Sequence, residues 1–514
     1  MTINKLECVK LKLMRLSRKA IFFLPFLLFL TLGFLLRAQE TLSGNFLFLL
    51  DQGRDMMAVK RIVFDHHLTL IGPNTSLQGV FQGPIWYYLL SIPTFLMNGD
   101  PWGSVILMLI ISMSVMLVSF FWIKKLFGYK AAITTLFLLA ISPQAVAAAT
   151  FSWNPHPMWL ILCLFIFSFY ELNQGKKKFH LPVWILIALM SHFEIALGFF
   201  IFLSTVVYLL LFNRRVLKSK YFFFGIIFFI ILLLPQIIFE LRHNFLMISS
   251  FAKTLHGENQ GLISNQEKSS YFVYTKGHFD NFQLNFDYAF FHEGVLEKIP
   301  LIFFLFILFS FLFGKKFKIF SANEHKFLSL NVKFIIILFI LFIFYPFPIR
   351  YWFLTGLEIF YILITGLILS KLMLNRLSAA VLYLFFIANL IIFIPRIYNL
   401  HSKPDYGSTS KVKGKTNAIE YIYKDANGKP FNLLVFTPSV YTDPYDYLTF
   451  ISSKNKYHYL PGTKKEGSFY LLIDPDYSKP WSYVGWLETV IKSGKIIYTK
   501  NLPGGFILQK RENI

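Results

Sequence analysis

Long apolar runs separated by short polar segments dominate the first 395 residues of the chain. Most runs approach the roughly 20 residues that a helix needs to cross the hydrocarbon layer of a bilayer. The run 181–212 is longer, and Ser191, His192 and Glu194 interrupt it, which predicts two helices that meet at a polar turn. Counting this run twice gives about eleven predicted spans, at residues 20–36, 102–123, 131–150, 157–170, 181–212, 221–241, 301–313, 332–347, 352–369 and 377–394.

The basic residues between these spans indicate how the chain is oriented. Cytoplasmic loops carry the excess of Lys and Arg in membrane proteins. With eleven spans placed as above, every basic cluster falls on the same side of the membrane. The clusters are the N-terminal tail, 124–130, 176–178, 214–220, 315–326 and 371–376. We therefore expect a multi-pass protein of the cell membrane, with a cytoplasmic N-terminus and an extracytoplasmic C-terminus.

A shorter apolar segment, 84–97, is predicted to be an amphipathic helix that lies in the outer interface. It contains Trp86, Tyr87 and Tyr88, and such aromatic residues prefer the membrane–water interface. Treating it as another span would invert every basic loop after it. Residues 1–395 are thus predicted to form a mainly α transmembrane domain, with outer loops at 51–101 and 242–298.

The composition excludes a protein that is soluble from end to end. Of the 514 residues, 55% are hydrophobic and 15% are charged, and the mean hydropathy is +0.55, whereas soluble domains are about 25% charged. The net charge of +23 is explained by basic cytoplasmic loops, so we expect no nucleic-acid partner. Cys8 and Cys163 are the only cysteines, which leaves neither a disulfide framework nor a cysteine-based metal site.

The pattern changes near residue 396 to polar and alternating sequence. Strands are predicted at 431–436, 468–473, 495–498 and 505–508, and the end of a helix at 488–493. A stretch of this length suffices for one small domain. Residues 396–514 are therefore predicted to form an extracytoplasmic α/β domain, without a P-loop, a glycine-rich dinucleotide signature or a zinc pattern.

Two carboxylates and an arginine follow the first span, in the block Asp51-Gln52-Gly53-Arg54-Asp55. The four-residue spacing puts Asp51 and Asp55 on one face if a helix begins here. One carboxylate could then act as a general base while Arg54 binds an anion. The alternative is a simple helix start, because acidic residues favour the first turn whatever their function.

Other polar residues on the same predicted face carry similar alternatives. Asn154 and His156 lie in a turn between two spans, where they either contact a polar ligand or cap the next helix. His192 and Glu194 interrupt an apolar hairpin, and ionisable groups at membrane depth usually mark a cavity or pathway. They could equally reach water at the tip of the hairpin.

Basic residues at the outer ends of later spans are candidates for binding phosphate. Arg350, followed by Tyr351, precedes one span, and Arg242 follows another. The planar donors of arginine can neutralise a lipid phosphate. The alternative is that these side chains extend to lipid headgroups. His66 and His67 are adjacent and therefore point in different directions, which makes them a poor pair of metal ligands.

These features resemble the GT-C glycosyltransferases of the protein O-mannosyltransferase and aminoarabinose-transferase type. The resemblance is good over about the first 215 residues. It is weaker through the later spans, where Arg350-Tyr351 resembles the basic-aromatic start of a late helix in the family. The C-terminal domain resembles the family only in its position after the last span. The matching segments are Asp51-Gln52-Gly53-Arg54-Asp55, Gly83-Pro84-Ile85-Trp86-Tyr87-Tyr88, Lys124-Lys125-Leu126-Phe127-Gly128 and Ser152-Trp153-Asn154-Pro155.

The resemblance implies an integral membrane enzyme that moves a sugar from a polyprenyl-phosphate donor to an extracytoplasmic acceptor, with inversion. The family's catalytic acid maps onto Asp51. Many relatives carry a second acid where this chain has Gln52, which leaves a share of the role open to Asp55 and weakens any claim of metal binding. No cofactor is required, and a divalent metal is unsupported. The expected donor-phosphate residues are Arg54, Arg350, Tyr351, Arg242 and His192, and the expected acceptor or sugar residues are Glu194, Asn154, His156, Trp86 and Tyr87.

Two other functions remain open at this point. A lipid-linked sugar flippase or transporter would also have many spans and ionisable groups on its outer face, but its two halves usually carry broken helices in matching positions. Only one break, at 191–194, is evident. A non-catalytic scaffold would bind a partner through the C-terminal domain. The sequence identifies neither the sugar nor the acceptor, which could be protein, lipid or polysaccharide.

Overall fold

The computed structural model describes residues 3–256, 271–292, 295, 298–345, 347–373, 375–402 and 409–513. The predicted outer loop 242–298 therefore lies partly outside the described residues. Within them the chain is mainly helical, as predicted. The helices are α1 (Ile3–Ser43), α2 (Leu50–Val63), α3 (Ile85–Leu96), α4 (Trp102–Phe127), α5 (Tyr129–Ile141), α6 (Pro143–Ala147), α7 (Met158–Asn173), α8 (His180–Met190), α9 (Ile195–Phe212), α10 (Lys220–Arg242), α11 (Leu246–Leu255), α12 (Tyr271–Phe290), α13 (Lys298–Lys316), α14 (Ala322–Ile343), α15 (Glu358–Leu372), α16 (Arg376–Ser402), α17 (Val412–Ala426), α18 (Asp443–Ser452) and α19 (Trp481–Trp486).

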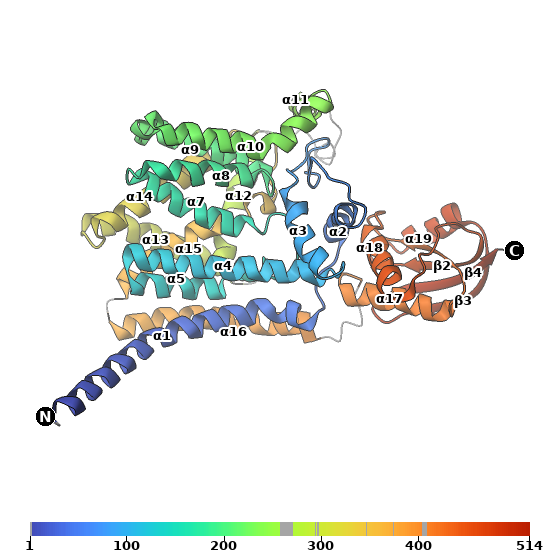
Figure 1. Cartoon of the computed structure of the whole chain (residues 1–514), viewed down its shortest axis with the longest axis horizontal. Helices are drawn as coiled ribbons and strands as arrows, with labels where there is room; N and C mark the ends of the chain where they lie inside the picture. Colours follow the sequence, from blue (N-terminus) through green and yellow to red (C-terminus); the bar gives the residue numbers. More distant parts are fainter. Residues whose placement is uncertain are drawn as a thin grey trace.

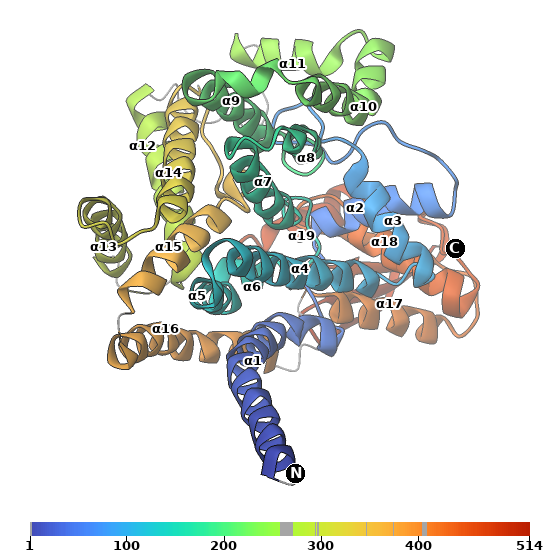
Figure 2. The same ribbon diagram turned by 60° about the vertical axis from the view of Figure 1, so that its left-hand side comes forward.

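The long helices form a bundle at one end of the molecule, and the C-terminal domain lies at the other (Figure 1). Helices α7 and α15 are buried along most of their length inside the bundle, whereas α10, α13 and α16 lie at its edge (Figure 2). By length and composition, five helices among the described residues can cross a membrane: α1 from Phe23, α4, α9, α10 and α14. A polytopic helix bundle is confirmed, and the number of eleven spans stays a prediction.

Several predicted spans are broken where the sequence supplies a reason. The run 181–212 divides into α8 and α9 at the expected polar turn. The run 131–150 ends as a regular helix at Ile141, because Pro143 has no N–H to continue the ladder and Ser142 caps the short α6. The predicted span at 352–369 starts late. Residues Tyr351–Leu354 form a 3₁₀ turn, Gly356 adopts φ +93°, and α15 begins at Glu358.

One buried arginine fixes α1 to the bundle. The guanidinium of Arg37 donates to the backbone carbonyls of Gly33, Leu139 and Ala140 at 2.6–3.0 Å and to Ser112 Oγ at 2.9 Å. The carbonyls of Leu139 and Ala140 lie in the last turn of α5, where they lack an intrahelical partner. Arg37 thus satisfies the end of α5 and sets the position from which the chain enters α2.

The C-terminal domain is the predicted small α/β domain. Its four strands are β1 (Asn432–Phe436), β2 (Gly467–Ile473), β3 (Lys495–Asn501) and β4 (Ile507–Asn513), in the order β1-β2-β4-β3. Strands β1 and β2 are parallel, with Leu434 opposite Leu471, and the other pairs are antiparallel. The strands predicted at 431–436, 468–473 and 495–498 are confirmed. The strand predicted at 505–508 starts later, at Ile507, and runs to Asn513, because Gly504 and Gly505 form a turn at positive φ.

This domain shares its core with the start of the chain. Phe46, Phe48 and Met56 belong to the same buried cluster as residues of α17, α18 and β2. Backbone hydrogen bonds join Phe48 N–H to the Ser410 carbonyl at 2.9 Å and Val412 N–H to the Phe46 carbonyl at 3.0 Å. The domain is therefore docked rigidly on the segment that carries α2.

Candidate active site

The first turn of α2 presents the acidic block that follows α1. Arg54 Nη1 lies 2.9 Å from Asp51 Oδ1, and Arg54 Nη2 lies 2.8 Å from Asp55 Oδ1. The two carboxylates are four residues apart, so the helix holds both within reach of one guanidinium. The Asp51 side chain is 41% exposed and that of Asp55 is 2% exposed. Asp51 is thus the carboxylate that a substrate can reach.

Asp55 lies behind Arg54 and orients it. Its Oδ1 accepts from Arg54 Nε as well as from Nη2, and its Oδ2 accepts from Trp86 Nε1 at 2.7 Å. Burial raises the pKa of Asp55, and the Arg54 guanidinium and the Trp86 N–H oppose this rise. Burial lowers the pKa of Arg54, but the carboxylates of Asp55 and Asp51 outweigh it and hold the pKa above its usual range. Arg54 therefore keeps its positive charge, and Tyr87 is buried beside it.

Side-chain amides connect α2 to the two polar turns predicted at the outer face. Gln52 accepts from Leu49 N–H and donates to the Ser152 carbonyl, both at 2.9 Å. Asn154 donates to the Phe193 carbonyl at 2.7 Å. These buried bonds fix the turn 152–157 between α2 and the α8–α9 hairpin.

Glu194 is the N-cap residue of α9 and is 3% exposed. Burial raises its pKa to about 8, although bonds from the Ala196 N–H and the Gln82 side chain lower it. Gln82 also accepts from Ile195 N–H at 2.7 Å. Glu194 is therefore mostly protonated at neutral pH and can donate a hydrogen bond.

A cavity of about 580 Å³ brings these segments together. Its polar wall contains Asp51, Arg54, Asn154, Glu194 and Tyr351, which are five of the residues predicted from the sequence. Further described residues that line it are Leu50, Asn74, Thr75, Ser76, Gln82, Trp153, Pro155, Trp352, Phe353, Tyr441 and Asp443. A carboxylate and a charged guanidinium thus line one cavity together with aromatic rings.

Two apolar hollows lie next to this cavity. The first, of about 380 Å³, shares Thr75, Ser76, Glu194 and Phe353 with it. The second, of about 510 Å³, shares Ile195, Phe199, Met247 and Ile248 with the first and runs along α10 and α11. A polar chamber and two apolar hollows thus lie next to one another, an arrangement that suits an amphipathic lipid.

Comparisons with known proteins agree with this arrangement. Residues 82–239 match the model of the dolichyl-phosphate-mannose-protein mannosyltransferase family. The structure of ArnT from Cupriavidus metallidurans bound to undecaprenyl phosphate aligns with a TM-score of 0.56 at 12% identity, covering 95% of this chain and 97% of that one. The chain has the GT-C glycosyltransferase fold. The predicted resemblance is confirmed, and the family match together with the fold indicates a membrane glycosyltransferase.

Two further solved structures also align with this chain. The apo structure of the same ArnT gives a TM-score of 0.56 at 12% identity and covers 96% and 98% of the two chains. The oligosaccharyltransferase AglB from Archaeoglobus fulgidus, in complex with an inhibitory peptide and a dolichol-phosphate, aligns with a TM-score of 0.43 at 13% identity, covering 95% of this chain and 74% of that one. No curated protein matches the sequence.

Other predicted site residues lie away from the cavity of this GT-C fold. His156 is buried against the Phe151 carbonyl and His192 against the Leu232 carbonyl. Burial lowers the pKa of each imidazole to about 4, so His192 has no positive charge to offer a phosphate. Arg242 is exposed at the end of α10. Trp86 supports Asp55 from behind rather than facing the chamber.

Arg350 lies next to the cavity wall. Its guanidinium carbon is 6.0 Å from the ring centre of Trp352, which lines the chamber and meets Trp153 edge-on at 6.2 Å. Arg350 is exposed and does not itself line the chamber. Within the described parts of the chain, no group of three or more His, Cys, Asp or Glu side chains is arranged to hold a metal ion.

Tyr441 and Asp443 are among the cavity residues that sequence reasoning missed, and they come from a part of the chain where no site residue was predicted. They come from the C-terminal domain, where Asp443-Pro444 begins α18. The Asp-Pro pair does signal the start of a helix. It carries no information on where that helix docks, because the contact with α2 joins segments almost 400 residues apart.

Proposed function

We propose that the chain is an integral membrane glycosyltransferase that transfers a sugar from a polyprenyl-phosphate donor to an extracytoplasmic acceptor, with inversion at the anomeric carbon. The observation that carries the proposal is that the Asp51–Arg54 chamber adjoins apolar hollows that lie along α10 and α11 and share lining residues with one another. The match to ArnT, solved with undecaprenyl phosphate, supports a donor of this class. The proposed orientation puts the chamber on the outer side of the cell membrane.

In the proposed reaction, the acceptor hydroxyl or amine attacks the anomeric carbon from the side opposite the phosphate. Asp51 accepts the proton of the nucleophile, since it is the exposed carboxylate of the block. The bond between the anomeric carbon and the phosphate oxygen breaks, and the polyprenyl phosphate leaves. The donor bond is already activated, so the reaction needs no nucleotide.

Arg54 is proposed to stabilise the departing phosphate, with Tyr351 and Arg350 as further donors. Charge that develops on a leaving group is stabilised best by donors fixed in advance. Asp55 fixes Arg54 through two N–H groups, which supports a positioning role for Asp55 and not a role as the base. Protonated Glu194 and Asn154 are proposed to bind hydroxyl groups of the sugar.

The test is consumption of labelled donors by the purified chain in nanodiscs, using a panel of undecaprenyl-phosphate hexoses and pentoses. Asp51→Asn is expected to lower transfer by about 10²-fold or more. The matched control is Asp65→Asn, because Asp65 is 43% exposed and paired with Lys60 at 2.9 Å, much as Asp51 is paired with Arg54. Full transfer by the Asp51→Asn variant would exclude Asp51 as the base. Movement of donor across the bilayer without cleavage would favour the flippase.

A further inference from the structure

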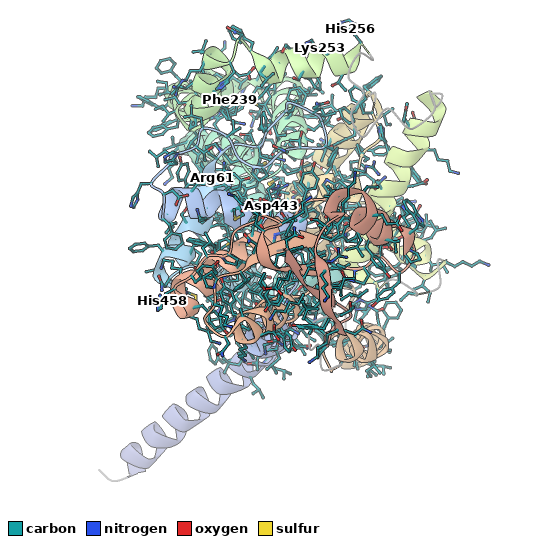
Figure 3. The ribbon with its side chains drawn as sticks, turned by 90° about the vertical axis from the view of Figure 1, so that its right-hand side faces the viewer. Arg61, Phe239, Lys253, His256, Asp443 and His458 are labelled. Atoms are coloured by element: carbon teal, nitrogen blue, oxygen red, sulfur yellow. The ribbon has the colours of Figure 1, made fainter. Side chains whose placement is uncertain are left out.

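The C-terminal domain contributes one wall of the chamber. Helix α18 packs against α2, and a Cβ atom built on Gly53 would lie 2.6 Å from Pro444 Cα and closer still to its backbone nitrogen. Gly53 is two residues from Asp51, and Pro444 follows Asp443. This close approach fixes Asp443 beside the Asp51–Arg54 pair. Figure 3 shows Asp443 near the middle of the face that carries the C-terminal domain.

The Asp443 carboxylate differs from the other acidic groups of the chamber. Asp51 is paired with Arg54, and Glu194 is bonded to Gln82 and Ala196. In the part of the chain that the structure describes, no hydrogen bond or ion pair engages the Asp443 side chain. A half-buried, unengaged carboxylate in a chamber wall is available to a ligand.

Different residues of the chamber suit different substrates. The residues that it shares with the apolar hollow, Thr75, Ser76, Glu194 and Phe353, suit the lipid donor of the proposed function. Tyr441 and Asp443 line the chamber but not that hollow. Resting on the proposed function, we infer that Asp443 and Tyr441 form the acceptor site, and that the acceptor group is a hydroxyl-rich glycan.

The side-chain chemistry of this wall selects among acceptor classes. An ionised carboxylate only accepts hydrogen bonds and can take two hydroxyl donors at once. The exposed ring of Tyr441 lines the same chamber as Trp153 and Trp352, and these rings offer flat apolar faces to the C–H face of a sugar ring. An ionised carboxylate has no hydrogen to donate to a phosphate, so Asp443 favours a hydroxyl donor. A glycan satisfies the carboxylate and the aromatic rings together.

The experiment measures transfer from a labelled undecaprenyl-phosphate sugar by the full chain in nanodiscs. The acceptor probes are maltotriose, for a free glycan, and monoglucosyl diacylglycerol, for a glycolipid headgroup. A serine-containing hexapeptide and an alkylamine are the contrasting probes. Asp443→Asn is expected to raise the KM for the acceptor by about tenfold. The kcat of transfer, and the rate of donor hydrolysis measured in the absence of acceptor, should each change by less than about twofold. Tyr441→Ala should raise the same KM. Because the Tyr441 side chain is 63% exposed, its removal should destabilise the fold only slightly.

Asp446→Asn is the matched control. It removes a charge from the same first turn of α18, but Asp446 is exposed and its Oδ2 accepts from Thr442 Oγ1 at 2.7 Å. An unchanged acceptor KM in both Asp443→Asn and Tyr441→Ala overturns the inference, as does loss of donor hydrolysis in Asp443→Asn or preference for the peptide or the amine. A wild-type chain that consumes no donor refutes the proposed function itself, which is a separate outcome.

Discussion

The bond between Trp86 and Asp55 offers a quantitative test of how Arg54 is held. In Asp55→Asn, one amide oxygen can still accept from Arg54, but the amide nitrogen replaces the oxygen that accepts from Trp86 Nε1 at 2.7 Å. Two N–H donors then face each other in a buried site. A buried donor left without an acceptor costs about 1–3 kcal/mol, and Arg54 also loses one of its two carboxylate charges. We expect a total destabilisation of about 3 kcal/mol.

The variant Trp86→Phe removes the donor and leaves Asp55 Oδ2 without a partner, at an expected cost of about 2 kcal/mol. In the double variant, the amide nitrogen introduced by Asp55→Asn no longer opposes an indole N–H. The combined destabilisation should therefore fall short of the sum by about 1–2 kcal/mol. The assay is the free energy of unfolding of the four purified chains in one detergent.

The control for this cycle is Asp65→Asn, whose exposed pair with Lys60 should contribute less than about 1 kcal/mol. Donor consumption should fall in Asp55→Asn as Arg54 loses its fixed position. Penalties that add within about 0.5 kcal/mol would show that Asp55 and Trp86 are independent. The claim that Trp86 holds the carboxylate that orients Arg54 would then be wrong.

Three further perturbations address separate contacts, each followed by thermal unfolding. Gly53→Ala should destabilise the chain by about 1–3 kcal/mol, because the new methyl group meets the backbone of Pro444; an unchanged Tm would place the domain further from α2. Asn154→Ala should cost about 1–3 kcal/mol by leaving the buried Phe193 carbonyl without its donor, and a neutral result would mean that water replaces the amide. The pKa of Glu194 is raised to about 8 in the folded chain, so the folded state holds a proton that the unfolded state releases above its ordinary pKa near 4.5. Stability from this group is present below about pH 4.5 and is lost as the pH rises through 8; Glu194→Gln should flatten that part of the Tm–pH curve, and an equal slope in both chains would contradict the shift.

The helices and strands were predictable because their signals are local. Apolar runs and alternation identify elements such as α4 or β2 without any knowledge of their neighbours. The Asp51–Arg54–Asp55 group was also predictable, since all three side chains belong to one helical turn and the spacing decides which of them meet.

The remainder of the site depends on which helices are neighbours in the bundle, and the hydropathy pattern of the sequence does not give this. The end of a span gives the depth of a residue in the membrane but not its place around the bundle. Arg242 and Tyr351 were both expected at the outer surface, yet only Tyr351 lines the chamber. The same reasoning explains Asp443, whose position depends on how α18 docks on α2.

The departure at Gln52 now has a structural explanation. A carboxylate at this position could accept from Leu49 N–H, as Gln52 does, but it could not donate to the Ser152 carbonyl. An amide can do both, and so it joins the start of α2 to the turn that carries Asn154. In this chain the second acidic position of the family therefore serves to connect two walls of the chamber. The proposed chemistry is left to one exposed carboxylate, Asp51, with Arg54 held beside it by Asp55.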